Sequence, residues 1–163
     1  MTVVKGDGRE WAVGDKLASG GFGAIYLARS DDLDAVIKLV PKDPGADREF
    51  LIAELSGVRN VLPLLDTGQT DDEWALVMPR AEESLRQHLE DQANRPLDVD
   101  TALSIMIDVA EALVDLDAKR VVHRDLKPEN VLRYNGRWCL IDFGIARYAE
   151  AATATNTRKD SMT

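Results

Sequence analysis

The segment from His123 to Asn130 constrains this chain more than any other part of its sequence. It reads His-Arg-Asp-Leu-Lys-Pro-Glu-Asn and lies between a stretch of helical periodicity and the short apolar run Val131–Leu132. Within six positions it supplies the carboxylate of Asp125, the cation of Lys127 and the amide oxygen of Asn130. Phosphoryl transfer needs groups of these kinds to orient a hydroxyl, to stabilise the moving phosphate and to bind Mg²⁺. The alternative is a charged loop after a helix, which does not need this combination.

A second acidic residue follows the next apolar run. Asp142 comes directly after Cys139–Ile141 and begins the sequence Asp-Phe-Gly, twelve residues after Asn130. An aspartate in this position is either a turn-forming residue or a metal ligand. Because a hairpin separates the two residues, we expect Asp142 to share a magnesium ion with Asn130.

A glycine-rich turn joins two predicted strands near the N-terminus. Residues 19–23 read Ser-Gly-Gly-Phe-Gly and stand between the apolar runs Trp11–Val13 and Ile25–Ala28. Glycine lets the backbone approach phosphate groups and direct N–H groups toward them. Alone, the pattern also fits a plain hairpin turn. A Rossmann or Walker loop leads into a helix, so a strand on each side favours the kinase type of glycine loop.

Lys38 lies within the apolar run Ala35–Val40, where an unpaired ammonium group would be costly to bury. Either its side chain reaches solvent at the strand edge, or it binds a phosphate while a carboxylate holds it in place. The predicted helix from about Asp47 to Val58 offers Glu49 and Glu54 for that purpose.

The remaining periodicity predicts a strand-rich first half and a helical second half. Further strands are expected around Leu62–Leu65, Trp74–Met78 and Trp138–Ile141, and helices over Ser84–Gln92 and Pro96–Ala118. Asp98 or Asp100 would cap the long helix. This helix carries a broad apolar stripe that needs a covering partner. The stripe consists of Ala102, Ile105, Met106, Val109, Ala110, Leu113 and Leu116.

Composition narrows the class of protein. Apolar residues make up 45% and charged residues 30% of the 163 positions, which suits a globular domain with a sizeable core. A formal charge of −9 argues against binding to nucleic acid or to anionic membrane. Cys139 is the only cysteine, so a reducing, cytoplasmic setting is expected. We expect neither a signal peptide nor a membrane-spanning segment.

In their order along the chain these motifs resemble the signature set of protein kinases, over about Trp11 to Arg147. Lys127, two residues after Asp125, is similar to the lysine of serine/threonine kinases, and the overall style resembles a bacterial member. The resemblance implies an α+β, two-lobe protein-kinase-like fold. Residues 1–78 would form a complete N-lobe of antiparallel sheet plus one helix, and residues 79–83 the hinge. Residues 84–163 would form an incomplete helical C-lobe that ends within the activation segment.

The resemblance also implies a function and a site. The function is ATP- and Mg²⁺-dependent transfer of the γ-phosphate to Ser/Thr hydroxyls of protein substrates. Asp125 and Lys127 would be catalytic, and Asn130 and Asp142 would bind the metal. Lys38 would contact the α- and β-phosphates, with Glu54 preferred to Glu49 as its partner. The nucleotide would also contact Leu17, Ala18, Ser19, Gly20, Gly21, Phe22, Gly23, Ile25, Val36, Met78 as gatekeeper, Pro79, Ala81 and Leu132.

Three departures from the family pattern stand out. Ala18 replaces the first glycine of the loop, the helix that carries Glu54 is short, and the chain ends at Thr163 without an Ala-Pro-Glu motif. A nucleotide-binding module without transfer activity and a small-molecule kinase of related fold stay open as alternatives, although Lys127 disfavours the second. We expect a homodimer or another partner to cover the incomplete C-lobe. Arg124 suggests control by phosphorylation between Ala149 and Thr163.

Overall fold

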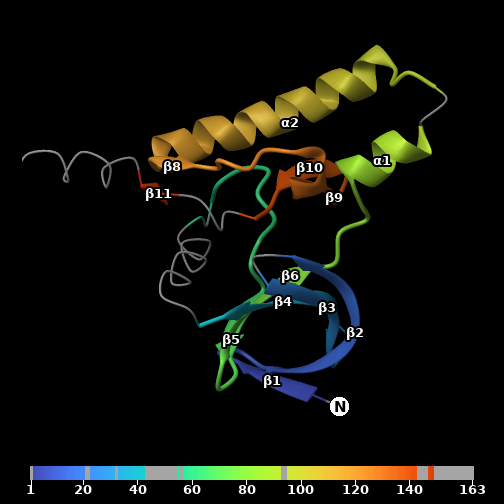
Figure 1. The fold of residues 1–163 in the computed structure, drawn as a ribbon. Coiled ribbons are helices and arrows are strands. Elements are labelled where there is room, and N and C mark those ends of the chain that lie inside the picture. The colour runs from blue at the N-terminus through green and yellow to red at the C-terminus, as the bar shows by residue number, and fades with distance from the viewer. Residues whose placement is uncertain are drawn as a thin grey trace, which may run out of the picture.

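The computed structural model describes residues 2–20, 23–31, 33–42, 55, 57–92, 95–142 and 147–148. Two lobes are apparent in Figure 1, a curved sheet built from the first part of the chain and a second lobe containing the long helix. The chain crosses between them after the strand that ends at Pro79.

The N-lobe is an antiparallel sheet. Its neighbouring strands follow the order β1-β2-β3-β4-β6-β5, and β1 pairs with β5 as well as with β2. The strands are β1 (Thr2–Gly6), β2 (Glu10–Gly20), β3 (Gly23–Ser30), β4 (Leu33–Pro41), β5 (Asp66–Gln69) and β6 (Glu73–Pro79).

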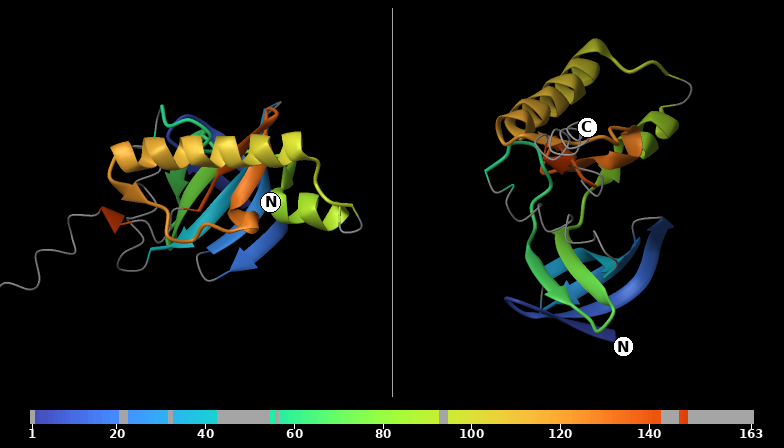
Figure 2. Two further views of the ribbon diagram at one scale, coloured as in Figure 1. Left: turned by 90° about the horizontal axis from the view of Figure 1, so that it is seen from above. Right: turned by 60° about the vertical axis from the view of Figure 1, so that its left-hand side comes forward.

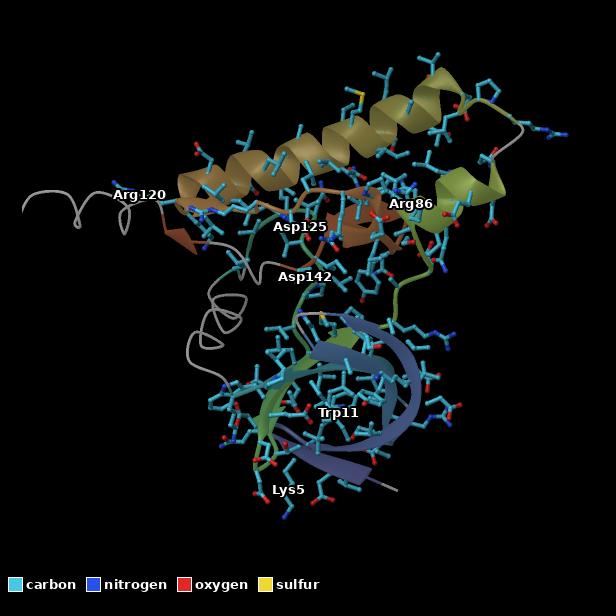
Figure 3. All side chains as sticks on the ribbon, in the orientation of Figure 1. Lys5, Trp11, Arg86, Arg120, Asp125 and Asp142 are labelled. Atoms are coloured by element: carbon cyan, nitrogen blue, oxygen red, sulfur yellow. The ribbon has the colours of Figure 1, made fainter. Side chains whose placement is uncertain are left out.

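The side chains of β4 alternate between the core of this lobe and the opposite face of the sheet. Ala35, Ile37 and Leu39 lie at every second position and are buried in a cluster with Trp11 and Val77. Because successive side chains of a strand point to opposite faces, Val36 and Lys38 face the other side of the sheet. The labelled Trp11 lies inside the curved sheet in Figure 3.

The carboxylate of Asp66, in β5, is bonded to the turn after β1 and to the start of β2. It accepts hydrogen bonds from Trp11 Nε1 at 2.8 Å, from Gly8 N at 3.1 Å and from Thr67 N at 2.9 Å. Gly68 lies so close to the backbone of β1 that a Cβ atom there would collide with the Lys5 carbonyl. These contacts hold β5 against the end of β1 and the start of β2.

Two sequence predictions for this lobe differ from the structure. The strand expected around Leu62–Leu65 begins instead at Asp66, and β1 was not predicted. Pro63 has no N–H to donate, so it does not fit within a paired strand. Leu62 N instead donates to Leu140 O in the other lobe, at 3.1 Å. Most of the predicted helix from Asp47 to Val58 lies outside the described residues.

The second lobe combines two helices with short strands. Its elements are β7 (Glu83–Ser84), α1 (Leu85–Asp91), α2 (Val99–Ala118), β8 (Val121–Val122), the short 3₁₀ helix η2 (Pro128–Asn130), β9 (Val131–Tyr134), β10 (Arg137–Leu140) and β11 (Arg147–Tyr148). Strands β10, β9 and β7 form one sheet, and β11 pairs with β8. Figure 2 shows α2 on the side of these strands that faces away from the N-lobe.

Side-chain caps define where the two helices begin. Ser84 and Gln87 form a reciprocal capping box at the start of α1. Asp98 accepts from Thr101 N and is therefore the cap of α2, which begins at Val99 rather than at the predicted Pro96. No helix among the described residues is both long and apolar enough to span a bilayer.

The apolar residues of α2 occupy two faces. Ile105, Ala112 and Leu116 are buried against a core that includes Trp138 and Leu140. Met106, which the sequence placed in the same stripe, is 66% exposed. It belongs to a second, outer face of exposed side chains: Val99, Leu103, Met106, Ile107 and Val114.

Candidate active site

The predicted catalytic residues converge where the two lobes meet. Asp125 and Lys127 lie on the loop between β8 and η2, Asn130 ends η2, and Asp142 follows β10. Figure 3 shows the labelled Asp125 in the second lobe below α2 and the labelled Asp142 nearer the N-lobe. The short strands on either side of the loop therefore bring both acidic residues to one place.

The carboxylate of Asp125 is held by two neighbours on its own loop. Lys127 Nζ lies 2.6 Å from Asp125 Oδ2, and Asn130 Nδ2 donates to the same oxygen at 3.0 Å. Asn130 Nδ2 also donates to the Asp125 carbonyl at 2.9 Å. The hydrogen bond from Lys127 is the main reason that the pKa of Asp125 is lowered, so the carboxylate is ionised at neutral pH.

His123 is buried and joins the loop of Asp125 to the segment that carries Asp142. Its Nδ1 atom accepts from Asp125 N at 3.3 Å, and its Nε2 atom lies 2.9 Å from the Ile141 carbonyl. Burial lowers the pKa of His123, which favours the neutral ring with the proton on Nε2. The sequence reasoning assigned no separate role to this residue.

Two residues of the site adopt left-handed backbone conformations. The φ angle is 65° at Arg124 and 66° at Asp142. Residues other than glycine rarely occupy this region, and such positions cluster at functional sites. The strained positions are therefore Arg124, the neighbour of the predicted catalytic Asp125, and Asp142, the predicted metal ligand itself.

Lys38 reaches across from the N-lobe to Asp142. Its Nζ lies 3.1 Å from Asp142 Oδ1, and the residue is 8% exposed. The structure thus excludes the alternative in which Lys38 extends from the strand edge into solvent. Glu54 and Glu49, its two predicted partners, lie outside the described residues.

Asn130 and Asp142 form a donor set that fits Mg²⁺. Because Asn130 uses its Nδ2 atom on Asp125, its side-chain oxygen remains for a metal, and Asp142 keeps its second carboxylate oxygen. Ile141 N donates to Asn130 O at 3.0 Å, which keeps the two segments together. No cluster of three or more His, Cys, Asp or Glu side chains suited to a metal occurs in the described residues. Two protein ligands suffice for Mg²⁺ when phosphate oxygens and water complete its shell.

A cavity of about 340 Å³ opens beside these groups, between β2, β3 and β4 on one side and the start of the second lobe on the other. Eight predicted nucleotide contacts line it: Leu17, Ala18, Ile25, Val36, Met78, Pro79, Ala81 and Leu132. Six further lining residues were not predicted: Leu62, Arg80, Glu82, Glu83, Gln87 and Ile141. Beside the cavity, Cys139 is buried in a cluster with Leu62 and Met78.

The glycine turn lies at the joined ends of β2 and β3. Gly20 pairs with Gly23, whose φ is 119° and whose Cβ position would collide with the Leu39 carbonyl. Glycine is therefore required at residue 23. The predicted contacts Ser19, Gly20 and Gly23 do not line the cavity, and Gly21 and Phe22 lie outside the described residues.

With this geometry established, comparison with known proteins places the chain in a family. The family model for the protein kinase domain matches residues 11–162. The chain therefore belongs to the protein kinase domain family, and the predicted two-lobe kinase fold is confirmed.

The chain is also similar to individual kinases. It is 32% identical over 153 residues to serine/threonine-protein kinase PrkC of Bacillus subtilis (strain 168), covering 86% of this chain and 23% of PrkC. It is 34% identical over 153 residues to serine/threonine-protein kinase 36 of Pongo abelii and also of Mus musculus, covering 88% of this chain and 11% of each relative. The chain thus spans less than a quarter of the length of these proteins.

Proposed function

We propose that this chain carries out ATP- and Mg²⁺-dependent transfer of the γ-phosphate to Ser/Thr hydroxyls of a protein substrate. The observation that carries the proposal is the 3.1 Å ion pair between Lys38 and Asp142 beside the hydrogen-bonded group of Asp125, Lys127 and Asn130. The names of the relatives, which describe serine/threonine kinases, support the same acceptor class.

The cavity accounts for nucleotide binding. Val36 and Ile25 from the N-lobe and Leu132 from the second lobe would sandwich the adenine ring. The Pro79 carbonyl and the Ala81 N–H would bond its polar edge. Lys38 would then place its charge on the α- and β-phosphates, since it projects from the cavity side of β4.

The groups around Asp125 account for the chemical step. The ionised carboxylate of Asp125 would orient the acceptor hydroxyl and take its proton as the oxygen bonds to the γ-phosphorus. The bond from that phosphorus to the β,γ-bridging oxygen breaks, and ADP leaves. Lys127 would stabilise negative charge on the transferred group. Mg²⁺, bound by Asn130 and Asp142, would neutralise phosphate charge.

The experiment that tests this function is transfer of labelled phosphate from ATP to a generic Ser/Thr peptide, with a panel of small-molecule acceptors in parallel. Replacing Asp125→Asn should lower turnover by about 10²–10⁴-fold while nucleotide affinity stays nearly unchanged, because the hydroxyl loses its base. Asp117→Asn, an exposed position on α2, is the matched control. Transfer to small molecules alone, or unchanged turnover in Asp125→Asn, would contradict the proposal.

A further inference from the structure

A second polar network lies outside the catalytic group, on the inner side of α2. Its centre is Asp108, which is 0% exposed and has no part in the proposed chemistry. Glu111 and Asp115 stand three and seven positions further along the helix and so share its face. A buried carboxylate is costly unless its oxygens are hydrogen-bonded, so its partners indicate what it holds.

Asp108 holds the beginning of β10. Its Oδ2 atom accepts from Trp138 N at 2.9 Å, and its Oδ1 atom accepts from Arg137 Nη1 at 2.8 Å. The side chain of Arg137 is 63% exposed, so that ion pair is partly screened by solvent. The Trp138 N–H is buried and would lose its partner outright without Asp108.

Glu111 and Asp115 hold the loop that contacts the end of the same strand. Arg59 donates to both Asp115 oxygens, at 2.7 and 2.9 Å, and to Glu111 at 3.0 Å. Asn60 Nδ2 donates to Glu111 and to the Asp108 carbonyl, each at 3.0 Å. The loop is thus fixed to the helix by side chains at two consecutive positions.

This loop continues the contact to β10. Leu140 N donates to Asn60 O at 2.8 Å, and Leu140 O accepts from Leu62 N at 3.1 Å. Strand β10 is therefore held at Trp138 by Asp108 and at Leu140 by the loop. Asp142 follows two residues after Leu140 and contacts Lys38 in the N-lobe, while Ile141 N, between them, donates to Asn130 O.

We propose that Asp108, Glu111 and Asp115 form a positioning face that sets the place of Asp142, an inference that rests on the proposed role of Asp142 toward Mg²⁺. The three carboxylates touch none of the proposed reacting groups. They act through β10 and through the loop around Asn60. Groups that orient a metal ligand typically change metal affinity by about 10–100-fold when they are removed.

The test separates metal-dependent from metal-independent nucleotide binding. The dissociation constant of ATP is measured by calorimetry with and without Mg²⁺ for the full chain and its variants. Asp108→Ala should reduce the affinity gain due to Mg²⁺ by about tenfold and leave the affinity without Mg²⁺ unchanged. Asp108→Asn should keep most of the gain, because its amide oxygen still accepts from Trp138 N. Asp117→Ala removes an exposed charge from the same helix and should behave as wild type.

Arg59→Ala provides the second variant, because the Arg59 side chain is 53% exposed and its loss should not prevent folding. It should also reduce the gain in ATP affinity due to Mg²⁺, but by a smaller factor than Asp108→Ala does. An unchanged gain in folded Asp108→Ala and Arg59→Ala, or an equal loss with and without Mg²⁺, would overturn the inference. If circular dichroism shows Asp108→Ala to be unfolded, Arg59→Ala decides. No Mg²⁺-dependent gain in the wild type would instead overturn the proposed function itself.

Discussion

The side chain of Lys38 shows that the need of one residue for a counter-charge can be predicted from sequence, whereas its contact with Asp142 could not be. An ammonium group inside an apolar strand needs a compensating charge, and the structure supplies the carboxylate of Asp142 at 3.1 Å. The two residues are 104 positions apart in sequence. Their contact therefore reports the folding of two lobes against each other, which no local pattern encodes.

Lys38→Met and Asp142→Asn should each remove most of the thermal stabilisation that ATP with Mg²⁺ gives the wild type. Ligand linkage contributes about 2.7 kcal/mol at a hundredfold excess over the dissociation constant, and both variants lose groups proposed to contact phosphate or metal. Differential scanning fluorimetry measures the shift. Lys42→Met, just after the same strand, should keep the full shift. A full shift in both site variants would contradict the assignment.

At the scale of elements, sequence patterns predicted the features that depend on residues close together in the sequence. The helix α2 ends at Ala118 as predicted and begins at Val99, three residues after the predicted start, with Asp98, one of the two predicted caps, before it. Strand β1 was not predicted, and it pairs both with the adjacent β2 and with β5, more than 60 positions away. Leu62 and Gln87 were not predicted to line the cavity, because only tertiary packing brings them there. Asp125, Lys127 and Asn130 could be predicted as a group because they are close in sequence.

The link between β5 and the start of β2 should be sensitive to Asp66. Replacing Asp66→Ala leaves the buried Trp11 Nε1–H without its acceptor, which costs about 1–3 kcal/mol. Chemical denaturation of the variant and the wild type measures this loss. Asp34→Ala breaks an exposed pair with Arg29 and should change stability much less. Equal stability of Asp66→Ala and wild type would contradict this prediction.

The contact between α2 and the Arg59 loop should weaken as the pH falls. Hydrogen bonds from Arg59 lower the pKa of Asp115 to about 2. An unfolded aspartate titrates near 3.9, so the stability that Asp115 contributes is complete above that pH and is lost as the pH falls toward 2. The difference in melting temperature between wild type and Asp115→Asn should therefore shrink over this range. A melting-temperature difference that stays constant on acidification would contradict the prediction. Asp117→Asn serves as the control.

On the scale of the whole molecule, the two lobes are joined by side chains as well as by the chain crossing at Pro79. Lys38 contacts Asp142, two residues after β10, and Leu62, in the loop before β5, contacts Leu140 at the end of β10. The fold and the closeness of Asp125, Lys127 and Asn130 could be predicted because their motifs are local. The closeness of the lobes could not be, because it depends on contacts between distant segments.

The outer face of α2 should drive self-association of the 163-residue chain. Val99, Met106 and Val114 are exposed, and burying side chains of this size stabilises by roughly 1.5–3 kcal/mol each. Light scattering of the purified chain should show a dimer that dissociates in the double variant Met106→Glu, Ile107→Glu. Val3→Glu, at an exposed apolar position on β1, should stay dimeric. A wild-type monomer at high concentration would contradict this expectation.

The burial of Cys139 has a practical consequence. Its surroundings raise the pKa of the thiol to about 11, so almost none of it is thiolate at neutral pH. Alkylating reagents attack the thiolate form, and this sulfur is also shielded from them by burial. A cysteine introduced at an exposed position would thus be the one that reacts. The chain can accept a fluorophore or spin label at a chosen site with its native cysteine in place, which allows distances between the lobes to be followed in solution.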